Sequence, residues 1–259
     1  MHARRALVRR PGPRLAEGLL THLERVPVDV DLARAQWEGY VAALHREGWE
    51  TVEVPPADDC PDAVFVEDTV VVYADLAVLA RPGAESRRPE TAGTEQTLTA
   101  MGYRVERIEA PGTLDGGDVL KHGARVWVGL GGRTNEQGAA QLGRLLAPLG
   151  AVVTAVPVTR VLHLKSAVTA LPDGTVVGYP PLVDEPATWS TFAAVPEEPG
   201  SHVVLLDGGT VLMSSGAPRT REMFEARGLR VVAVDISEFE KLEGCVTCLS
   251  VRLRHPMAD

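Results

Sequence analysis

Two cysteines near the C-terminus are the first candidates for chemistry. Cys245 and Cys248 form a Cys-x-x-Cys pair in GCVTCLS, which could bind a metal, exchange electrons or supply a nucleophile. A structural zinc site normally needs four ligands, yet there is no second such pair, and His255 is the only histidine nearby. A redox pair belongs at a helix N-terminus, where the dipole stabilises a thiolate, whereas this segment has the pattern of a strand. We therefore expect a nucleophile and no metal.

Acidic residues interrupt an apolar segment earlier in the chain. Asp62 precedes the run VFVEDTVVV at 64–72, and Glu67 and Asp68 break it. If the run is a strand, one of the two adjacent acids points inward, because side chains alternate between faces. An inward carboxylate is costly unless it meets a cation or hydrogen-bond donors. The alternative is a hairpin turn with exposed acids.

A second acidic motif, a histidine and two arginines complete the set. Asp115 and Asp118 flank two glycines in TLDGGDVL, which is either a tight turn or a carboxylate site for a histidine or a guanidinium. His163 in VLHLKS is either a hydrogen-bonded core residue or a base for a nucleophile. Arg87 and Arg133 could hold a substrate carboxylate or be surface charges. Thiol, imidazole and several carboxylates favour a cationic electrophile such as a guanidinium, whose planar fork pairs with carboxylates.

The elements that must position these residues alternate between helices and strands. Helices are predicted at 28–48, at 134–150 with Thr134 as N-cap, and at 218–228 with Gly228 as C-cap. Apolar and alternating runs predict strands and hairpins at 5–10, 64–80, 118–130, 151–158, 175–180, 201–214, 230–235 and 245–253.

Several candidate residues recur at a nearly constant spacing. Glu67, Asp115, His163, Asp207 and Cys248 are separated by 48, 48, 44 and 41 residues, and LDGG at 114–117 returns at 206–209. A period in the forties indicates repeated supersecondary units. Five units of hairpin, helix and strand would suit a closed ring with these residues around a central channel. An ordinary α/β sandwich with coincidental spacing is the alternative.

The composition limits the class of protein. The chain has 259 residues, 45% of them hydrophobic, which is enough for one large domain or two small ones. Its net charge of -9 gives no reason to bind nucleic acid or an anionic membrane. Three cysteines argue against a disulfide framework. There is no apolar run of about 18 residues and no signal-peptide pattern at the N-terminus. We expect a soluble cytoplasmic globular protein.

Six segments resemble the dimethylarginine dimethylaminohydrolase family of the guanidine-modifying, amidinotransferase-like superfamily. They are PDAVFVEDTVVV, RPGAESRR, TLDGGDVL, VGLGGRTN, LHLKS and LEGCVTCLSVRL, in order along nearly the whole chain. The resemblance implies an α/β fold, the five-bladed α/β propeller (pentein), with ββαβ-type repeats around a central active-site channel. Residues 1–259 would form a single catalytic domain. The implied reaction converts asymmetric dimethylarginine or monomethylarginine to citrulline and a methylamine without a cofactor.

The resemblance also assigns roles position by position. It makes Cys248 the nucleophile, His163 the general acid/base and Asp115 the acid that partners the histidine. The implied substrate-binding residues are acids for the guanidinium, arginines for the α-carboxylate, a lid residue and a backbone contact: Asp62, Glu67, Asp68, Arg87, Arg133, Leu20 and Leu242.

Three further residues carry expectations. Asp118 is expected to be structural. Deiminases of unmodified arginine tend to have an acid two residues after the histidine, and Lys165 at that position favours the dimethylarginine branch. On a strand, Cys245 would face away from Cys248 as a buried filler, so Cys245→Ala should be nearly silent.

The expected mechanism is a covalent one. A bound guanidinium lowers the pKa of Cys248, sulfur attacks the guanidinium carbon, and His163 protonates the departing amine and then activates water. The alternatives are another guanidine-modifying reaction, such as that of an arginine deiminase or an amidinotransferase, and a non-catalytic protein that binds cationic amino acids. The expected partner is a small-molecule methylated arginine, with no nucleic acid and no membrane, and the protein is expected to be a monomer or homodimer.

Overall fold

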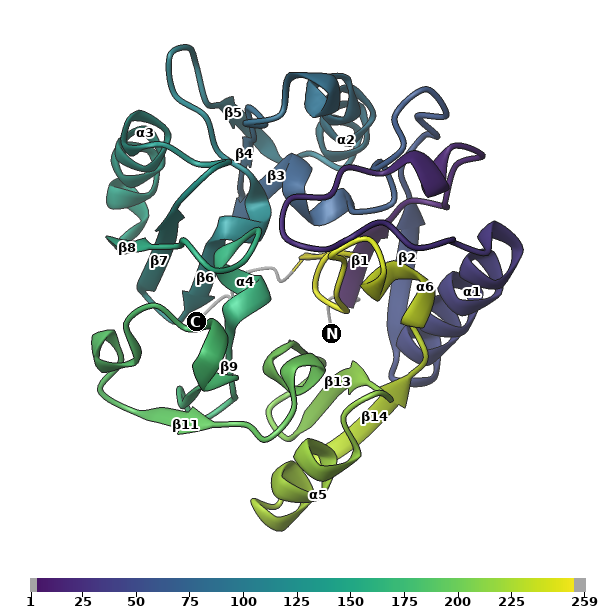
Figure 1. Ribbon diagram of the computed structural model, residues 1–259. Helices are drawn as coiled ribbons and strands as arrows, with labels where there is room; N and C mark the ends of the chain where they lie inside the picture. The colour runs from purple at the N-terminus through teal and green to yellow at the C-terminus, as the bar shows by residue number, and fades with distance from the viewer. Residues whose placement is uncertain (1–3, 254–259) are drawn as a thin grey trace.

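The chain forms a ring of five small sheets. The computed structural model describes residues 4–253, and within them five three-stranded sheets surround a common centre (Figure 1). In each sheet the middle strand pairs antiparallel with one neighbour and parallel with the other. The ring expected from the spacing is therefore confirmed, and the α/β sandwich is excluded.

The strands of each sheet, or blade, come from one stretch of chain except in the first blade. The first blade consists of β15 (Val251–Leu253), β1 (Arg4–Val8) and β2 (Trp49–Glu53). The others are β3 (Val70–Tyr73), β4 (Leu76–Leu79) and β5 (Arg104–Arg107); β6 (Val119–His122), β7 (Arg125–Leu130) and β8 (Val152–Pro157); β9 (Val168–Ala170), β10 (Val176–Gly178) and β11 (Phe192–Ala194); and β12 (Val203–Leu205), β13 (Thr210–Ser214) and β14 (Arg230–Val234). Because β15 pairs with β1, the last strand of the chain closes the ring.

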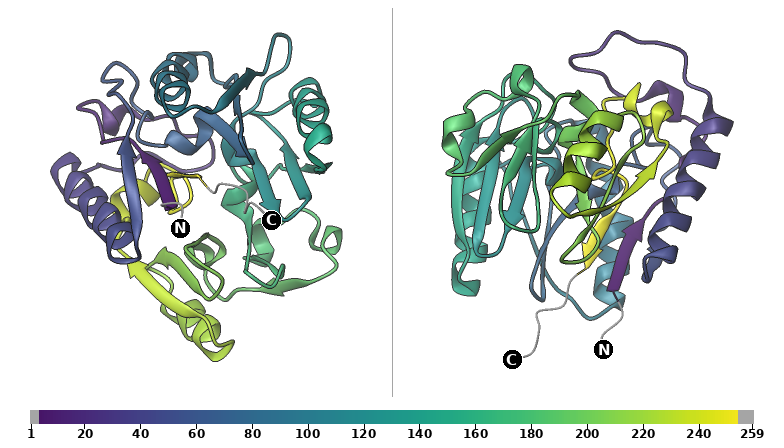
Figure 2. Two further views of the ribbon diagram at one scale, coloured as in Figure 1. Left: turned by 180° about the vertical axis from the view of Figure 1, so that it is seen from behind. Right: turned by 90° about the horizontal axis from the view of Figure 1, so that it is seen from below.

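Helices connect the two parallel strands of most blades and lie on the outer rim (Figures 1 and 2). They are α1 (Val30–Arg46), α2 (Thr91–Ala100), α3 (Glu136–Leu146) and α5 (Pro218–Ala226). In the fourth blade, the residues described between β10 and β11 contain only the 3-10 turns η6 (Pro180–Leu182) and η7 (Pro186–Thr188). The apolar face of each long helix packs on its blade; Trp37, Tyr40 and Leu44 of α1 are buried in this way. No helix within residues 4–253 has the length and apolarity needed to cross a membrane.

Short turns precede the first strand of each blade and lie toward the centre. They are η2 (Val66–Thr69), η4 (Gly116–Asp118), α4 (Leu164–Ala167), η8 (Glu198–Ser201) and the turn at 245–248 before β15. We call these five segments the inner turns. The remaining short elements are η1 (Leu15–Glu17), η3 (Glu85–Glu90), η5 (Ala147–Leu149) and α6 (Ser237–Glu240).

Local sequence patterns gave most elements but placed several of them wrongly. Helices were expected where α1, α3 and α5 occur, but Asn135, whose side chain accepts from Gly138 N, is the N-cap of α3 in place of Thr134. Gly228 lies just beyond the Arg227 cap of α5, with a φ of 83°. The helix α2 was missed, because TAGTEQTLTA has little apolar periodicity.

Two predicted strands begin too early. Residues 66–69 form η2, so both Glu67 and Asp68 are buried and do not alternate in and out. Residues 245–248 form a turn, and the strand covers Val251–Leu253 alone. His163 is the N-cap residue of the short helix α4. His255, considered above as a possible metal ligand, lies outside the described residues.

The repeated LDGG motif does not mark equivalent positions. Asp115 precedes the first strand of its blade, whereas Asp207 lies in the exposed hairpin turn between the first two strands of another. Its carboxylate accepts from Gly209 N and Thr210 N, which is an ordinary turn contact. The residue of the fifth blade that follows an inner turn is His202, which is buried.

Candidate active site

A small cavity lies where the inner turns meet. Its lining residues come from the inner turns and the residues just before them, from η3, from the loop between β7 and α3, and from the chain between β1 and α1: Leu19, Asp62, Phe65, Asp68, Arg87, Arg133, Leu162, His163, Leu242, Glu243, Gly244 and Cys248. We call this the central cavity. Its volume of about 10 Å³ leaves room for about one water molecule. The site is therefore closed.

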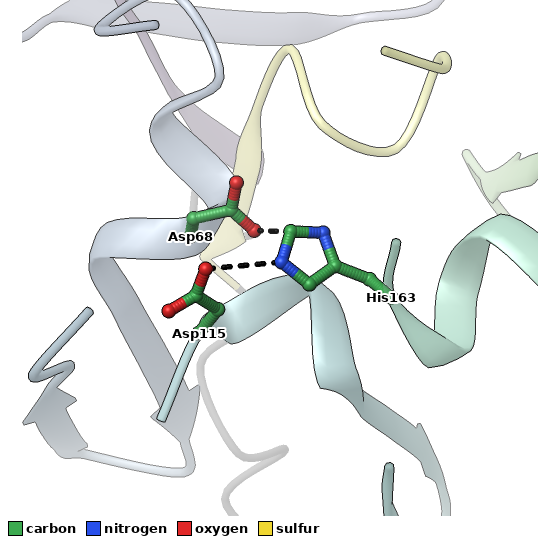
Figure 3. Close-up of side chains that lie close together, drawn as sticks. All are labelled: Asp68, Asp115 and His163. Carbon is green, nitrogen blue, oxygen red and sulfur yellow. Dashed lines mark hydrogen bonds and ion pairs between the residues drawn. The ribbon is translucent and has the colours of Figure 1, made fainter. Parts of the chain in front are cut away.

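A histidine lies between two carboxylates at one wall of the cavity. His163 Nε2 is 3.0 Å from Asp115 Oδ2, and His163 Nδ1 is 3.7 Å from Asp68 Oδ1 (Figure 3). All three side chains are buried. Burial alone would lower the pKa of His163, but the charges of Asp68, Asp118 and Asp115 raise it to about 9. The imidazole is therefore protonated at neutral pH and can donate a proton.

Asp115 and Asp118 have different partners although they lie in one motif. Asp115 Oδ1 accepts from Gly83 N, and its Oδ2 faces His163. Asp118 accepts from Thr134 Oγ1 at 2.6 Å and from Leu164 N at 2.9 Å, and burial raises its pKa to about 6. Asp118 thus ties down the backbone next to His163, which fits the structural role expected for it.

Asp68 belongs to a buried ion network with Arg87. Arg87 Nη1 is 2.7 Å from Asp68 Oδ2, while its Nε and Nη2 donate to Glu90. Burial opposes ionisation, but His163 and Arg87 lower the pKa of Asp68 to about 2. Because Nη2 also contacts the carbonyls of Asp62 and Phe65, most donors of Arg87 are already used within the protein. Its contacts hold Asp68 ionised beside the cavity.

Arg133 has a hydrogen-bond donor left for a ligand, whereas most donors of Arg87 are used within the protein. Its Nη1 is buried and has no hydrogen-bond partner among residues 4–253, although Asp115 Oδ2 lies 3.9 Å away. Its Nη2 donates to Thr21 Oγ1 at 3.4 Å. An unpartnered buried guanidinium donor at a cavity wall is costly unless a ligand accepts from it. Arg133 is thus suited to hold an anionic group of a ligand.

The chain between β1 and α1 covers the cavity. We call residues 11–28 the lid strap; in Figure 1 it loops over the ring beside the C-terminal segment. Asp62 accepts from Leu19 N through both oxygens, and burial raises the pKa of Asp62 above its ordinary value. Leu19, and not the expected Leu20, lines the cavity; Leu20 packs against the core of the first blade. Leu242 lines the cavity as expected.

The two cysteines of the Cys-x-x-Cys pair touch each other. The turn at 245–248 places Cys245 Sγ and Cys248 Sγ 3.3 Å apart, so the expectation that they face opposite sides is wrong. Both are buried. Their mutual hydrogen bond lowers the pKa of Cys245 and raises that of Cys248 well above its ordinary value. His202 adds to the first shift, and Glu67 and Asp68 add to the second. Cys248 therefore carries the proton in the closed site.

Glu67 lies apart from the other predicted binding acids. Its Oε1 pairs with Lys165 Nζ at 2.6 Å and with Arg252 Nη2 at 3.2 Å, and its backbone N–H donates to Cys248 O. It lines a second, larger cavity of about 520 Å³, which also includes Lys165 and Arg252. Glu67 is not among the residues that line the central cavity, where Asp62 and Asp68 are. Its position supports the turn that carries Cys248.

Several cavity residues were missed by the sequence. Leu19, Phe65, Leu162, Glu243 and Gly244 have no chemical motif of their own, and they reach the cavity only because the ring closes. Gly117 was seen only as part of a turn. A Cβ there would lie 2.6 Å from Asp68 Oδ1 and 2.7 Å from His163 Nδ1. The glycine is therefore required for these two side chains to approach each other.

The cluster in Figure 3 also has the composition of a cation site. One ligand atom from each of Asp68, Asp115 and His163 lies within 4.8 Å of the others. The imidazole of His163 is protonated at neutral pH, and an imidazole must be neutral to bind a metal ion. A metal ion would therefore have to displace that proton.

A ring of five α/β blades with a buried cysteine, histidine and carboxylates at its centre defines a guanidine-modifying enzyme of the pentein class. No protein-family model matches the chain. It is 62% identical over 254 residues to N(G),N(G)-dimethylarginine dimethylaminohydrolase of Streptomyces coelicolor, covering 98% of each chain. The chain belongs to the dimethylarginine dimethylaminohydrolase family.

Two solved structures extend the likeness to three dimensions. One is the dimethylarginine dimethylaminohydrolase of Pseudomonas aeruginosa, a cysteine-to-serine variant in complex with citrulline. It is 34% identical with a TM-score of 0.89, covering 98% of this chain and 100% of that one. The other is a histidine-to-glycine variant of a dimethylarginine dimethylaminohydrolase, as an adduct with S-methyl-L-thiocitrulline. It has the same identity and TM-score, covering 97% of this chain and 100% of that one.

Proposed function

We propose that the protein hydrolyses Nω-methylated arginines, namely asymmetric dimethylarginine and monomethylarginine, to citrulline and dimethylamine or methylamine. The observation that carries the proposal is the placement of Cys248, the protonated His163 and the ionised Asp68 around one closed cavity. These are a nucleophile, a proton donor and an anionic site for a cation. The family membership and the relatives' names support the same reaction.

Binding precedes chemistry and requires the lid strap to move. The present volume of about 10 Å³ cannot hold an arginine derivative, so residues near Leu19 must open for entry. Asp68 and Asp62 then face the guanidinium, and Arg133 faces the α-carboxylate. Burial raises the pKa of Asp62, and the substrate guanidinium gives this carboxylate a cationic partner when it binds. Reclosure excludes water during the first half of the reaction.

The first half of the reaction makes a covalent intermediate. The substrate cation offsets the charges of Glu67 and Asp68 that raise the pKa of Cys248, so the thiol releases its proton to solvent as the substrate binds and a thiolate forms. The sulfur attacks the guanidinium carbon. His163, protonated and held by Asp115, donates its proton to the departing amine and leaves an S-alkylthiouronium.

The second half returns the enzyme to its starting state. Neutral His163 takes a proton from a water molecule, whose oxygen attacks the same carbon. The carbon–sulfur bond then breaks, the remaining hydroxyl proton passes to the departing Cys248 sulfur, and citrulline is released. No part of this cycle uses a cofactor. We further propose that residues 1–259 act as one catalytic domain in the cytoplasm, as a monomer or homodimer, with no nucleic-acid or membrane partner.

A product assay tests the proposal directly. Purified protein is incubated separately with asymmetric dimethylarginine, symmetric dimethylarginine and arginine, and citrulline, dimethylamine and ammonia are measured. We expect citrulline and dimethylamine in equal amounts from asymmetric dimethylarginine. Ammonia from arginine as the main product would instead make the protein a deiminase. Substrate binding without any product, and with an affinity that Cys248→Ala leaves unchanged, would make it a binding protein.

A further inference from the structure

Glu243 fastens the lid strap to the C-terminal segment. Its Oε1 accepts hydrogen bonds from three successive backbone N–H groups, of Thr21 at 3.0 Å, of His22, and of Leu23 at 2.8 Å. More than two hundred residues of chain separate Glu243 from these donors. A carboxylate that accepts from consecutive amides occupies an anion-binding concavity of the backbone. The lid strap is therefore closed onto a side chain that also lines the central cavity.

The second carboxylate oxygen of Glu243 makes no hydrogen bond within the described chain. Oε2 is buried and has no hydrogen-bond partner among residues 4–253. A buried carboxylate oxygen left unpaired is costly, because it has lost its water without replacement. The cost disappears when a ligand in the cavity donates a hydrogen bond to it. A ligand group that binds Glu243 Oε2 must therefore be a hydrogen-bond donor, and a cationic donor suits the carboxylate best.

Arg133 presents the complementary deficit in the same cavity. Its buried Nη1 lacks an acceptor within the described chain, as Glu243 Oε2 lacks a donor. Both residues contact Thr21, Arg133 through the hydroxyl and Glu243 through the backbone N–H. A carboxylate oxygen without a donor and a guanidinium nitrogen without an acceptor therefore belong to two side chains that contact the same residue of the lid strap. A zwitterion with adjacent ammonium and carboxylate groups satisfies both.

The backbone at Glu243 shows that the carboxylate is kept there at a cost. Glu243 has a φ of 59°, in the left-handed region that favours glycine. Its neighbour Gly244 cannot carry a side chain, because a Cβ would lie 2.3 Å from the Phe65 ring. A glycine at 243 would relieve the strain of about 1 kcal/mol but would remove the carboxylate. Strain of this kind is found where a side chain serves a site.

We propose that Glu243 binds the α-ammonium group of the substrate through Oε2, opposite Arg133, while Oε1 holds the lid strap. Glu243 is then a specificity-determining residue that selects α-amino acids over guanidines without an amino group. It also couples occupation of the cavity to closure, because one carboxylate contacts both ligand and lid strap. The proposal rests on the proposed function for the guanidine end of the ligand and on Glu243 and Arg133 for the other end.

A binding experiment isolates this role from catalysis. Calorimetry on Cys248→Ser protein compares L-citrulline with 5-ureidopentanoic acid, which lacks only the α-amino group. The same pair is measured after adding Glu243→Gln, which keeps an oxygen for the lid strap but removes the charge. Glu238→Gln is the matched control, because Glu238 also accepts a backbone N–H, that of Asp29, but does not line the cavity.

The expected result is a change in a ratio. Glu243→Gln should reduce the preference for citrulline over its deamino analogue by about tenfold to a hundredfold, the usual effect of losing a hydrogen bond to a charged group. Affinity for the deamino analogue should change less than about threefold, and Glu238→Gln should leave the preference as it was. In protein that keeps Cys248, Glu243→Gln should reduce the ratio of kcat/KM for asymmetric dimethylarginine to that for its deamino analogue in the same way. The change should appear as a higher KM for asymmetric dimethylarginine.

Two outcomes would overturn the inference. If Glu243→Gln weakens both ligands equally, Glu243 only fastens the lid strap. If the variant keeps the full preference for citrulline, the α-ammonium binds elsewhere. Failure of the proposed function is a separate result: wild-type protein would release no dimethylamine from asymmetric dimethylarginine, while the calorimetric ratio would still report on Glu243.

Discussion

Replacing Asp115 by asparagine tests how the charge of His163 is set. The substitution keeps the shape of the side chain, and the amide oxygen can still accept from Gly83 N, as Asp115 Oδ1 does at 2.9 Å. It removes the negative charge that faces His163 Nε2 at 3.0 Å. Asp68 and Asp118 remain, so His163 loses one of three neighbouring charges. The expected effect is a lower pKa and a less firmly oriented imidazole.

The size of the effect follows from the contact. A charge pair at this distance would be worth at most about 5 kcal/mol at an effective dielectric constant of about 20. The amide keeps a neutral hydrogen bond, so the net loss is the difference between charged and neutral bonds, about 1–2 kcal/mol. That loss lowers the pKa of His163 by about 1 from its value of about 9. The same energy lowers the rate at neutral pH by about fivefold to thirtyfold.

The assay is the pH dependence of kcat/KM for asymmetric dimethylarginine between pH 6 and 10. The alkaline limb, where the imidazolium is lost, should move about one pH unit toward acid in Asp115→Asn. Asp207→Asn is the matched control, because it changes the aspartate of the other LDGG motif, whose carboxylate is exposed. A limb that stays in place in Asp115→Asn, whatever the rate, would show that Asp115 does not set the protonation of His163.

Three more outcomes follow from the site. Cys245→Ala removes the largest cause of the raised pKa of Cys248. Without substrate, Cys248 of this variant should therefore be alkylated at lower pH than in wild type, which mass spectrometry can follow. An unchanged pH profile of alkylation would mean that the two thiols do not interact. Gly117→Ala should cost about 1–3 kcal/mol of stability and most of the activity by displacing His163, whereas Gly132→Ala, which has open space, should do neither. The pKa of His163 in the folded protein is raised to about 9. Its contribution of about 3 kcal/mol to stability is therefore complete below about pH 6.5 and lost as pH rises through about 9. Denaturation of wild type and His163→Gln across this range should show that the difference in their free energies of unfolding shrinks as pH rises.

The sequence predicted the ring because its evidence was long-range. The spacing of Glu67, Asp115, His163 and Cys248 reflects one inner turn per blade, and the structure places all four at such turns or beside them. The fifth landmark, Asp207, was chosen through the LDGG repeat and is wrong, because a two-glycine turn suits an exposed hairpin as well as a buried turn. Spacing therefore identified the repeat, and motif similarity misassigned one member of it.

Contacts of the lid strap could not be predicted in the same way. Leu19 and Glu243 are held at the cavity by hydrogen bonds between residues distant in the sequence. Leu19 bonds Asp62, 43 residues away, and Glu243 bonds residues 21–23, across most of the chain. Neither residue type is unusual at a surface, and neither lies in a repeated position. The expected Leu20 is one residue from the correct position, which is the error to be expected where a segment has no regular secondary structure. Only tertiary closure gives these residues their roles.

The remaining errors share one cause, and it explains how the ring makes an active site. At 64–69 and 245–250 an apolar sequence predicted a strand, and the chain instead turns before the strand begins. These segments lie where the blades converge, so a turn can be buried from all sides and its apolar residues imitate a strand. A turn, unlike a strand, directs neighbouring side chains to one place. It allows Asp68 to face His163, and it brings Cys248 into contact with Cys245. The repeat supplies the equivalent positions, and different residues at those positions supply the separate parts of the chemistry.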